Sequence, residues 1–558
     1  MIMRAPVAPS LAAATAGRVS RRTLVLSGAA AGLLALAPAP FAARAAQDDA
    51  EALFNMVIIS GSPDTLDPAD NWEGSGGFGI LAHVYDGLFR FKGAETAEIV
   101  PLLAAEVPTA ENGGISEDGL QYTVKLRPEA KFADGSPVDA AAVAASYERT
   151  RALKLGVDFL LDQINTVEAV DPETVRFTLK QPFSPFLNSI GSVFANEVVN
   201  PAVVAEHATD DDPYAHEWFT DNTAGSGPYI LERFERDLGQ ATLVRNRDWW
   251  QGWSDGPHLD RVIVQYIPEQ ATARLMLEQG DADYVAGVSA EALAALANTP
   301  GITTVEGITM GQTFIALNTQ MAPYDNVLVR QALAYAINYD AIIDGVYGGG
   351  KRMDSVTPPM VGYAPAATQY TYDLEKAKAL FAEAGYPDGL DLTIAVAQED
   401  EQGSLALQLL QADLATIGVN LTITPIEASA MFTQMTNGDP AQALPAMFSF
   451  MASDYPDAYQ LLALGYGTRS LPPASCCNYG SYTNPAMDEI IARVETTLDP
   501  EERQAALQEG FDLAYTDEPL IWVHNFADRG AMKDTVQGWE FNYVNGTAYA
   551  PLEQMSIS

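Results

Sequence analysis

The sequence predicts an α/β protein of several domains. Apolar and polar residues alternate over 120–126, as in a half-buried strand. A strand at 390–396, a helix at 404–417 and a strand at 419–426 follow one another closely, which requires a crossover connection and a partly parallel sheet. A chain of 558 residues is long enough for two to four domains with a large core.

Capping residues mark further helices. Asp139 is a suitable N-cap for a helix at 140–153. Asn326 is in the same position before a long helix expected at 327–347, which ends at three glycines. Another helix, at 372–384, ends before a glycine. No fixed-period repeat and no low-complexity linker separates these elements, so we expect domains that share several chain crossings.

The first residues form an export signal. Arg21 and Arg22 precede a Gly- and Ala-rich apolar run at 24–37, and a small-residue site follows at 43–45. This pattern indicates twin-arginine export with cleavage near Ala45. The alternative is a disordered leader that does not direct export. The apolar run is too short to anchor the chain in a bilayer. We therefore expect a periplasmic mature protein.

Composition excludes several functions. The chain has 73 acidic and 31 basic residues, a net charge of -42, and loss of the five leader arginines makes it -47. Such a surface repels nucleic acid and anionic lipid, so neither is expected as a partner. Two cysteines cannot form a disulfide framework, and the scattered histidines show no metal-ligand spacing. We expect no metal, no cofactor and no membrane span.

Enzyme motifs are also lacking. The glycines of 74–79 fit G-x-G-x-x-G, but no strand precedes them, so we read a loop rather than a dinucleotide site. His216 and Glu217 lack the second histidine of a zinc-protease helix, and no G-x-S-x-G elbow occurs. We expect a protein that is not an enzyme, with a secreted hydrolase as a distant alternative.

Short segments in a fixed order resemble the family 5 extracellular solute-binding proteins of ABC importers, which include dipeptide-, oligopeptide- and nickel-binding receptors. The stretch 118–146 is the most diagnostic of them. The others are 62–68, 84–88, 225–229, 246–250, 317–318, 329–333, 336–337, 410–414 and 417–419.

The resemblance implies a type II periplasmic-binding-protein fold, with two lobes around a cleft and an extra subdomain on the first lobe. After the leader at 1–45, lobe I would comprise 46–96, 220–312 and 528–558, the extra subdomain 97–219, and lobe II 313–527. Crossings near 314–319 and 524–530 would form the hinge.

The resemblance also suggests ligand-binding residues. Peptide-binding relatives have a W-x-x-D-Y segment whose aspartate pairs with the α-ammonium of the peptide, and Asp454 falls on that position. Its neighbours Met451, Ser453 and Tyr455 would also line the site, with Met451 where the family often has Trp. The alternative is an exposed acidic turn. Two further contacts are expected from the glycine-rich loop, Asn71 and Trp72.

The carboxylate end of a peptide lacks an obvious partner. Dipeptide-binding relatives place an arginine where this chain has 397–401, which contains no basic residue. Either backbone amides and a residue such as Arg469 meet the carboxylate, or the ligand has none. Gln398 and Glu399 would suit hydroxyls or a second ammonium. Equally, they would be the solvated start of a helix.

Cys476 and Cys477 are adjacent and are the chain's only cysteines. Consecutive Cα atoms lie about 3.8 Å apart, which is below the usual disulfide range of about 4.4–6.8 Å. A vicinal disulfide would therefore be a strained tight turn, and the alternative is two free thiols. The following 482–485 resembles the family's Y-x-N-P before a helix, which implies a loop beside the cleft.

Together these features predict a monomeric periplasmic receptor that delivers a peptide, or a similar amine-bearing solute, to the membrane permease of an ABC importer. The same receptor could instead take an oligosaccharide, an opine or a metal chelate, because the expected arginine is missing.

Overall fold

The computed structural model describes residues 51–71, 77–194, 197–438, 443–475 and 477–558. The export signal, Trp72 and Cys476 lie outside the described residues. The chain divides into a short unit, Met1–Glu51, and a compact unit, Ala52–Ser558, to which all the elements below belong. Across the described ranges, no helix combines the length and apolar character that a membrane crossing requires.

A mixed sheet of 11 strands forms the centre of the compact unit. Its order is β14-β13-β15-β11-β16-β10-β1-β9-β8-β7, and β12 pairs with β16. The strands are β1 Leu53–Ile58, β7 Tyr229–Glu235, β8 Gln240–Arg245, β9 Arg261–Tyr266, β10 Tyr284–Ala286, β11 Ile302–Leu317, β12 Lys351–Arg352, β13 Asp391–Ala397, β14 Asn420–Ile426, β15 Ala446–Met451 and β16 Leu520–Lys533.

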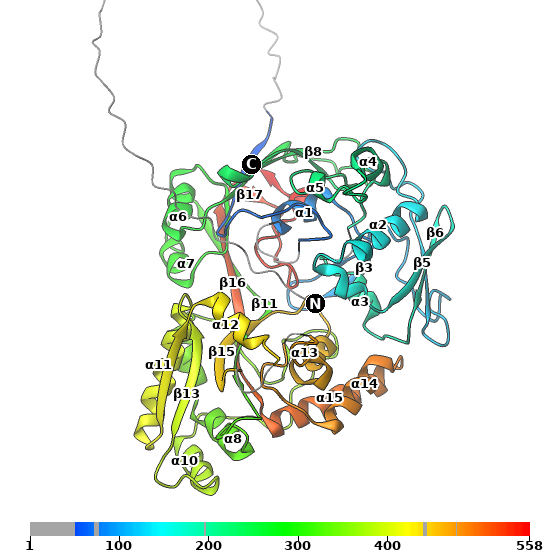
Figure 1. Ribbon diagram of the computed structural model, residues 1–558. Coiled ribbons are helices and arrows are strands. Elements are labelled where there is room, and N and C mark those ends of the chain that lie inside the picture. The colour runs from blue at the N-terminus through cyan, green and yellow to red at the C-terminus, as the bar shows by residue number, and fades with distance from the viewer. Residues whose placement is uncertain (1–50, 72–76, 195–196, 439–442, 476) are drawn as a thin grey trace, which may run out of the picture. The chain divides into compact units, whose positions relative to one another are not determined.

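Two long antiparallel strands, β11 and β16, connect the two halves of this sheet. Near β10, Ile302–Ile308 pairs with β16 alone, whereas Gln312–Leu317 lies between β16 and β15. The register shifts between Ile308 and Gln312 and again between Thr313 and Phe314. In Figure 1 the two strands run side by side through the middle, with α8, α10, α11 and α13–α15 around their lower end.

Three smaller sheets complete the strands. One has three strands in the order β4-β6-β5. The other two have two strands each, β2 with β3 and β17 with β18. Their bounds are β2 Phe89–Lys92, β3 Glu98–Pro101, β4 Gln121–Lys125, β5 Ile164–Asp171, β6 Thr174–Leu179, β17 Val536–Gln537 and β18 Ser556–Ile557.

Helices cover the sheets. They are α1 Phe78–Val84, α2 Ala140–Leu153, α3 Phe186–Ile190, α4 Pro201–His207, α5 His216–Phe219, α6 Gln270–Gln279, α7 Ala290–Leu296, α8 Val327–Ala336, α9 Tyr339–Gly345, α10 Leu374–Glu383, α11 Glu401–Thr416, α12 Ala428–Met435, α13 Ala458–Tyr466, α14 Pro485–Thr496 and α15 Pro500–Asp517. Short 3₁₀ turns are η1 Val157–Leu161, η2 Arg236–Leu238, η3 Thr468–Ser470 and η4 Leu552–Gln554.

The hydrophobic core joins regions that are far apart in the sequence. One buried cluster contains Val124 and Phe177 from the β4-β6-β5 sheet together with Leu462 of α13 and Phe511 of α15. The side chains around β1 and β9 belong to a different cluster. The small sheet therefore shares its apolar core with the α13–α15 region.

Several predicted elements are confirmed. Helix α2 matches the expected range, and the side chain of Asp139 accepts the N–H of Ala142 as an N-cap. Strands β13 and β14 are parallel neighbours connected by α11, as the strand-helix-strand pattern predicted. Asn484 caps α14, with Pro485 in the first turn.

The single long helix predicted at 327–347 is wrong. Helix α8 ends at Ala336, Ile337 is extended with ψ 121°, and α9 begins at Tyr339. The reason is Asn338, whose side chain accepts the N–H of Ala341 and so caps a new helix. Asparagine competes with the backbone in this way and therefore interrupts helices.

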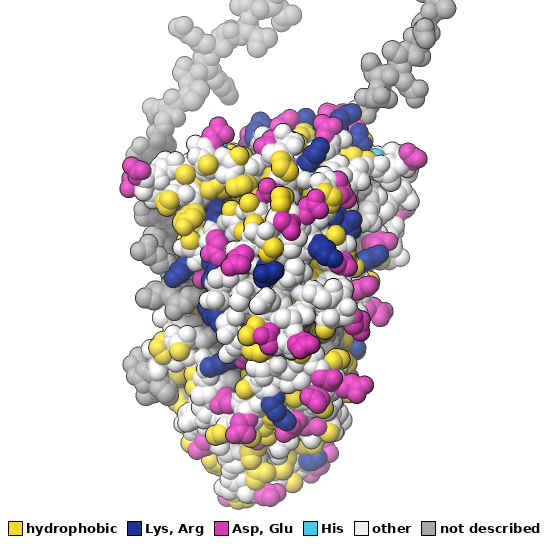
Figure 2. All heavy atoms as spheres, turned by 90° about the vertical axis from the view of Figure 1, so that its right-hand side faces the viewer, with side chains coloured by type: hydrophobic (Ala, Val, Ile, Leu, Met, Phe, Trp, Pro, Cys, Tyr) yellow, Lys and Arg dark blue, Asp and Glu magenta, His cyan; other side chains and the backbone are white. Residues whose placement is uncertain are grey.

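Acidic residues are dispersed over one face of the molecule. On the face shown in Figure 2, Asp and Glu side chains alternate with Lys and Arg and do not collect in one patch. The high negative charge is therefore distributed over this face as a solvated surface.

Candidate functional site

The loop between β15 and α13 carries the predicted ligand-binding aspartate. Asp454 is half-buried, and the side chain of Gln460, in the first turn of α13, holds it at two points. The backbone N–H of Asp454 donates to Gln460 Oε1 at 2.8 Å, and Gln460 Nε2 donates to Asp454 Oδ2. The side-chain amide of Gln460 thus orients the Asp454 carboxylate.

The predicted neighbours lie in the same segment. Met451 ends β15 and is buried, as are Ser453 and Tyr455. Burial raises the pKa of the Tyr455 hydroxyl well above its ordinary value, so this group stays a protonated donor. The structure therefore brings Met451, Ser453, Asp454 and Tyr455 together on one short loop.

A buried ion pair anchors the end of this loop. Asp457 caps α13, and its Oδ1 lies 2.6 Å from Arg503 Nη2 of α15. Arg503 Nε donates to Ser184 Oγ at 2.7 Å, and Asn188 Nδ2 donates to Asp457 Oδ2 at 2.9 Å. Ser184 and Asn188, from the segment after β6, thus hydrogen-bond to the Asp457–Arg503 ion pair of the α13–α15 region.

The same segment makes further contacts. Ser192 Oγ donates to the carbonyl oxygen of Asp454 at 2.6 Å, so it touches the candidate site directly. Gln181 Nε2 donates to Glu495 Oε1 at 3.0 Å, and the Phe183 ring packs edge-on against Tyr459. Sequence reasoning missed these partners, because nothing in the sequence pairs 181–192 with residues that follow 262 or more positions later.

The β11–β16 crossing adds polar groups next to the loop. Gln312 lies opposite Met451 on one side and Asn525 on the other. Next along β11, Thr313 Oγ1 lies 2.7 Å from His524 Nδ1. Burial lowers the pKa of His524 to about 4, so its ring is neutral at physiological pH. Gln312 was not singled out from the sequence, because β11 contains several other polar residues.

Other predicted contacts are placed elsewhere. Asn71 is half-buried and donates to the carbonyl of Thr65 at 2.8 Å. Gln398 and Glu399 are exposed and hydrogen-bonded to each other, and Glu399 also accepts the N–H of Ala428 at the start of α12. These bonds match the solvated-terminus alternative for Gln398 and Glu399.

The segment that follows the cysteines packs against β11. Cys477 is not a free thiol and has a positive φ of 89°, while Cys476 lies outside the described residues. Tyr479 stacks on Phe314 of β11, with ring centroids 6.0 Å apart and planes 4° apart. The vicinal disulfide therefore stays a prediction.

Basic residues near the loop already have acidic partners. Arg469 Nη1 lies 2.7 Å from Glu495 Oε2, and its other nitrogen donates to the Tyr459 hydroxyl. Arg503 pairs with Asp457, as above. Arg469 is thus not poised as an unpaired cation for a ligand carboxylate.

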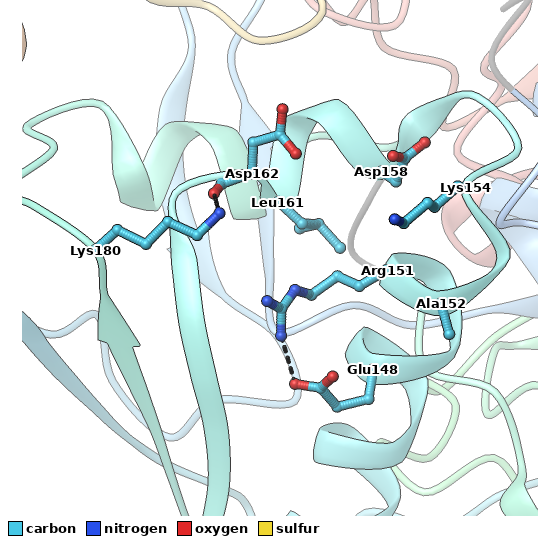
Figure 3. Close-up of a pocket in the computed structure, with 8 residues that line it drawn as sticks. All are labelled: Glu148, Arg151, Ala152, Lys154, Asp158, Leu161, Asp162 and Lys180. Atoms are coloured by element: carbon cyan, nitrogen blue, oxygen red, sulfur yellow. Dashed lines mark hydrogen bonds and ion pairs between the residues drawn. The ribbon is translucent and has the colours of Figure 1, made fainter. Parts of the chain in front are cut away.

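A hollow of about 310 Å³ lies away from this site, between α2, η1 and β6 (Figure 3). Arg151, Lys154 and Lys180 line it, but Arg151 pairs with Glu148 at 2.6 Å and Lys180 donates to the Asp162 carbonyl. Cations and acids balance there, so it resembles a solvated surface network. Within the described part of the chain, no group of three or more His, Cys, Asp or Glu could hold a metal ion.

Comparisons with known proteins agree with this architecture. Residues 98–470 match the family model for bacterial extracellular solute-binding proteins, family 5 (middle). The glutathione-binding protein GsiB of Salmonella paratyphi A is 30% identical over 494 residues, which cover 88% of this chain and 91% of GsiB.

Solved structures are similar as well. The periplasmic binding protein DppA of Helicobacter pylori, in complex with the peptide STSA, is 25% identical, with a TM-score of 0.72 over 90% of this chain and 98% of DppA. MoaA from A. tumefacien R10, in complex with mannopinic acid, is 27% identical, with a TM-score of 0.71 over 91% of this chain and 100% of MoaA.

Fold and site together define a two-lobed solute-binding protein with the type II periplasmic-binding-protein fold, its lobes enclosing a cleft and the first carrying an extra subdomain. The chain belongs to family 5 of the bacterial extracellular solute-binding proteins. The family identified from the short sequence segments is thus confirmed.

Proposed function

We propose that this protein is the periplasmic receptor of an ABC importer and that it binds a peptide, or a peptide-like solute, through a cationic amine. The observation that carries the proposal is the half-buried Asp454 carboxylate on the β15–α13 loop, oriented by Gln460. A carboxylate facing an ammonium in a cleft that closes over it makes a strong charge-assisted bond. GsiB and DppA, named above for glutathione and a peptide, support the ligand class.

The receptor role implies a transport partner and a compartment. The protein would exist as a monomer, follow the twin-arginine route with cleavage near Ala45, and hand its solute to the membrane permease. It would release that solute unchanged, since binding rather than turnover is its task. Incubating the pure protein with candidate solutes and finding a product would contradict this part of the proposal.

The test begins with ligand discovery. Thermal melting of the wild type should be recorded with a panel of di- to pentapeptides, reduced glutathione and Ser-Thr-Ser-Ala, because a ligand that binds only the folded state raises the melting temperature. The strongest peptide is then titrated calorimetrically into Asp454→Asn. Loss of the counter-charge for a buried ammonium should cost about 2–5 kcal/mol of binding.

A surface acid provides the matched control. Asp211→Asn changes an exposed carboxylate in the same way and should alter binding by less than about 1 kcal/mol. Equal affinity of Asp454→Asn and the wild type would refute amine recognition at this position.

A second ligand class has one observation in its favour. Arg469 is engaged by Glu495, and 397–401 contains no basic residue, so neither of these two positions offers an unpaired cation to a ligand carboxylate. An oligosaccharide, an opine or a metal chelate would then be the solute, and MoaA is a relative described with an opine-type ligand, mannopinic acid. Stabilisation by these compounds and not by peptides would decide for this alternative.

A further inference from the structure

Two buried polar side chains beside the candidate site lack hydrogen-bond partners. Gln312 is 0% exposed, and neither its Nε2 nor its Oε1 has a partner within the described structure. Ser453 is 4% exposed, and its Oγ is likewise without a partner. Buried polar groups in folded proteins are almost always paired with protein, water or ligand, so an unpaired group next to a candidate binding site is a candidate contact for the solute.

Their position ties both groups to the site. Gln312 occupies the register shift of β11, directly opposite Met451 in β15, and Ser453 follows Met451 by two residues. Side chains two apart on a strand share a face, so Gln312 lies on the face of Phe314, on which Tyr479 stacks. Gln312 therefore lies opposite the strand residue that precedes the Asp454 loop and on the same face of β11 as the ring on which Tyr479 stacks.

The neighbouring strand shows that an unpaired amide is not a general feature of this face. Asn525 of β16 is the direct cross-strand partner of Gln312 and is also buried. Its Nδ2 donates to the carbonyl of Gly311 at 3.1 Å. One amide of the pair is thus satisfied by the protein itself, whereas neither the donor nor the acceptor of Gln312 has a protein partner.

We propose that Gln312 is a specificity-determining residue that recognises an amide group of the bound solute, with the Ser453 hydroxyl beside it. The N–H and the C=O of one residue in an extended peptide point to the same side, and they match Gln312 Oε1 and Nε2 in a reciprocal pair of hydrogen bonds. Since Gln312 sits where β11 crosses between the two halves of the sheet, the solute would contact the crossing itself. This inference rests on the proposed peptide-like ligand and specifies which part of that ligand Gln312 recognises.

The test is a double-mutant cycle on protein and ligand. The probe is the strongest-binding peptide of the melting panel, together with analogues in which each backbone amide in turn is replaced by an ester, which lacks the N–H. Gln312→Met keeps the length of the side chain but removes both polar atoms. Wild type should bind the peptide about tenfold more tightly than Gln312→Met does, the effect of one or two hydrogen bonds.

The decisive measurement is the ratio of the affinity for the amide peptide to the affinity for its ester analogue. At one position of the peptide, the wild type should prefer the amide by about tenfold, and Gln312→Met should lose that preference. A merely structural role of Gln312 would weaken both ligands alike and leave the ratio unchanged.

The control is the paired strand residue. Gln312→Met breaks no hydrogen bond within the protein, so its ligand-free melting temperature should equal or exceed that of the wild type, whereas Asn525→Leu should melt lower. A peptide that binds the wild type and Gln312→Met with the same amide-to-ester ratio would overturn this inference and leave the proposed function standing. If no peptide binds the wild type, the proposed function fails and this inference fails with it.

Discussion

Arg503 Nη2 lies 2.6 Å from Asp457 Oδ1, and both side chains are removed from solvent, at 11% and 1% exposure. Asp457 ends the loop that begins with Asp454, while Arg503 lies on α15. Ser184 and Asn188, from the segment after β6, complete the hydrogen bonds of this pair. The candidate ligand loop is therefore held from two directions at once.

Removing one partner of this pair should be costly. Arg503→Met leaves the Asp457 carboxylate buried without its counter-charge, and we expect a loss of about 3–5 kcal/mol in the free energy of unfolding. Urea denaturation followed by circular dichroism measures it. Arg493→Met is the control, because its pair with Glu509 is more than half exposed on both sides and should contribute less than about 1 kcal/mol. Equal losses in the two variants would show that burial does not set the strength of the pair.

The contact from α3 should restrain the ligand loop. Asn188→Ala removes a hydrogen bond to a charged oxygen of Asp457, worth about 1.5–3 kcal/mol. Amide hydrogen exchange should accelerate in a peptide covering 453–458, as local opening becomes easier. Asn222→Ala, which loses only an exposed bond to the Trp218 carbonyl, should leave exchange in that peptide unchanged. Identical exchange in the two variants would mean that the loop is held without this contact.

We expect the ionisation of His216 to make the free energy of unfolding depend on pH. Asp67 is fully buried and accepts both Arg149 Nη1 and Nη2 at 2.7 Å, and His216 Nδ1 lies 2.8 Å from its Oδ2. The hydrogen bond to Asp67 raises the pKa of His216, with the charges of Asp67 and Asp70 acting in the same direction against desolvation. A raised pKa means that protonated His216 stabilises the folded state.

This stabilisation is complete below the unfolded pKa of about 6.5 and is lost as pH rises through the higher folded value. His216→Gln should therefore lower the free energy of unfolding more at about pH 5.5 than at about pH 8.5. Urea titrations of both proteins at the two pH values measure the difference. A loss that is the same at both, or larger at the higher pH, would contradict a stabilising imidazolium.

The two cysteines should contain no free thiol. Cys477 has a positive φ and is not a free thiol, and the chain's only other cysteine is Cys476. Alkylation of the denatured, unreduced protein should leave the peptide that contains both residues unmodified and lighter than the dithiol by two hydrogen atoms. After reduction, two alkyl groups should be added. Alkylation without prior reduction would show that no vicinal disulfide forms.

Local signals predicted local structure well. Asp139 predicted the start of helix α2, because an N-cap acts only on the next few backbone N–H groups, whereas helix α14 was expected from the resemblance of 482–485 to a family segment. The same logic failed at Asn338, a cap inside a run of helix-forming residues, whose effect depends on whether the chain actually turns there. Asp454, Ser453 and Tyr455 were chosen as ligand contacts through the resemblance to a family segment, and their role in binding stays a prediction.

The sequence by itself determined the α/β class, the family and the loop that carries Asp454, since these depend on periodicity, capping and short ordered motifs. Only the tertiary structure decided that Ser192 and Asn188 reach that loop across more than 260 residues, and that Arg469 is engaged by Glu495. It also decided that Gln312 is buried with an unsatisfied amide while Asn525 beside it is satisfied. Burial and long-range pairing arise from packing of the whole chain, and no local pattern of residues encodes them.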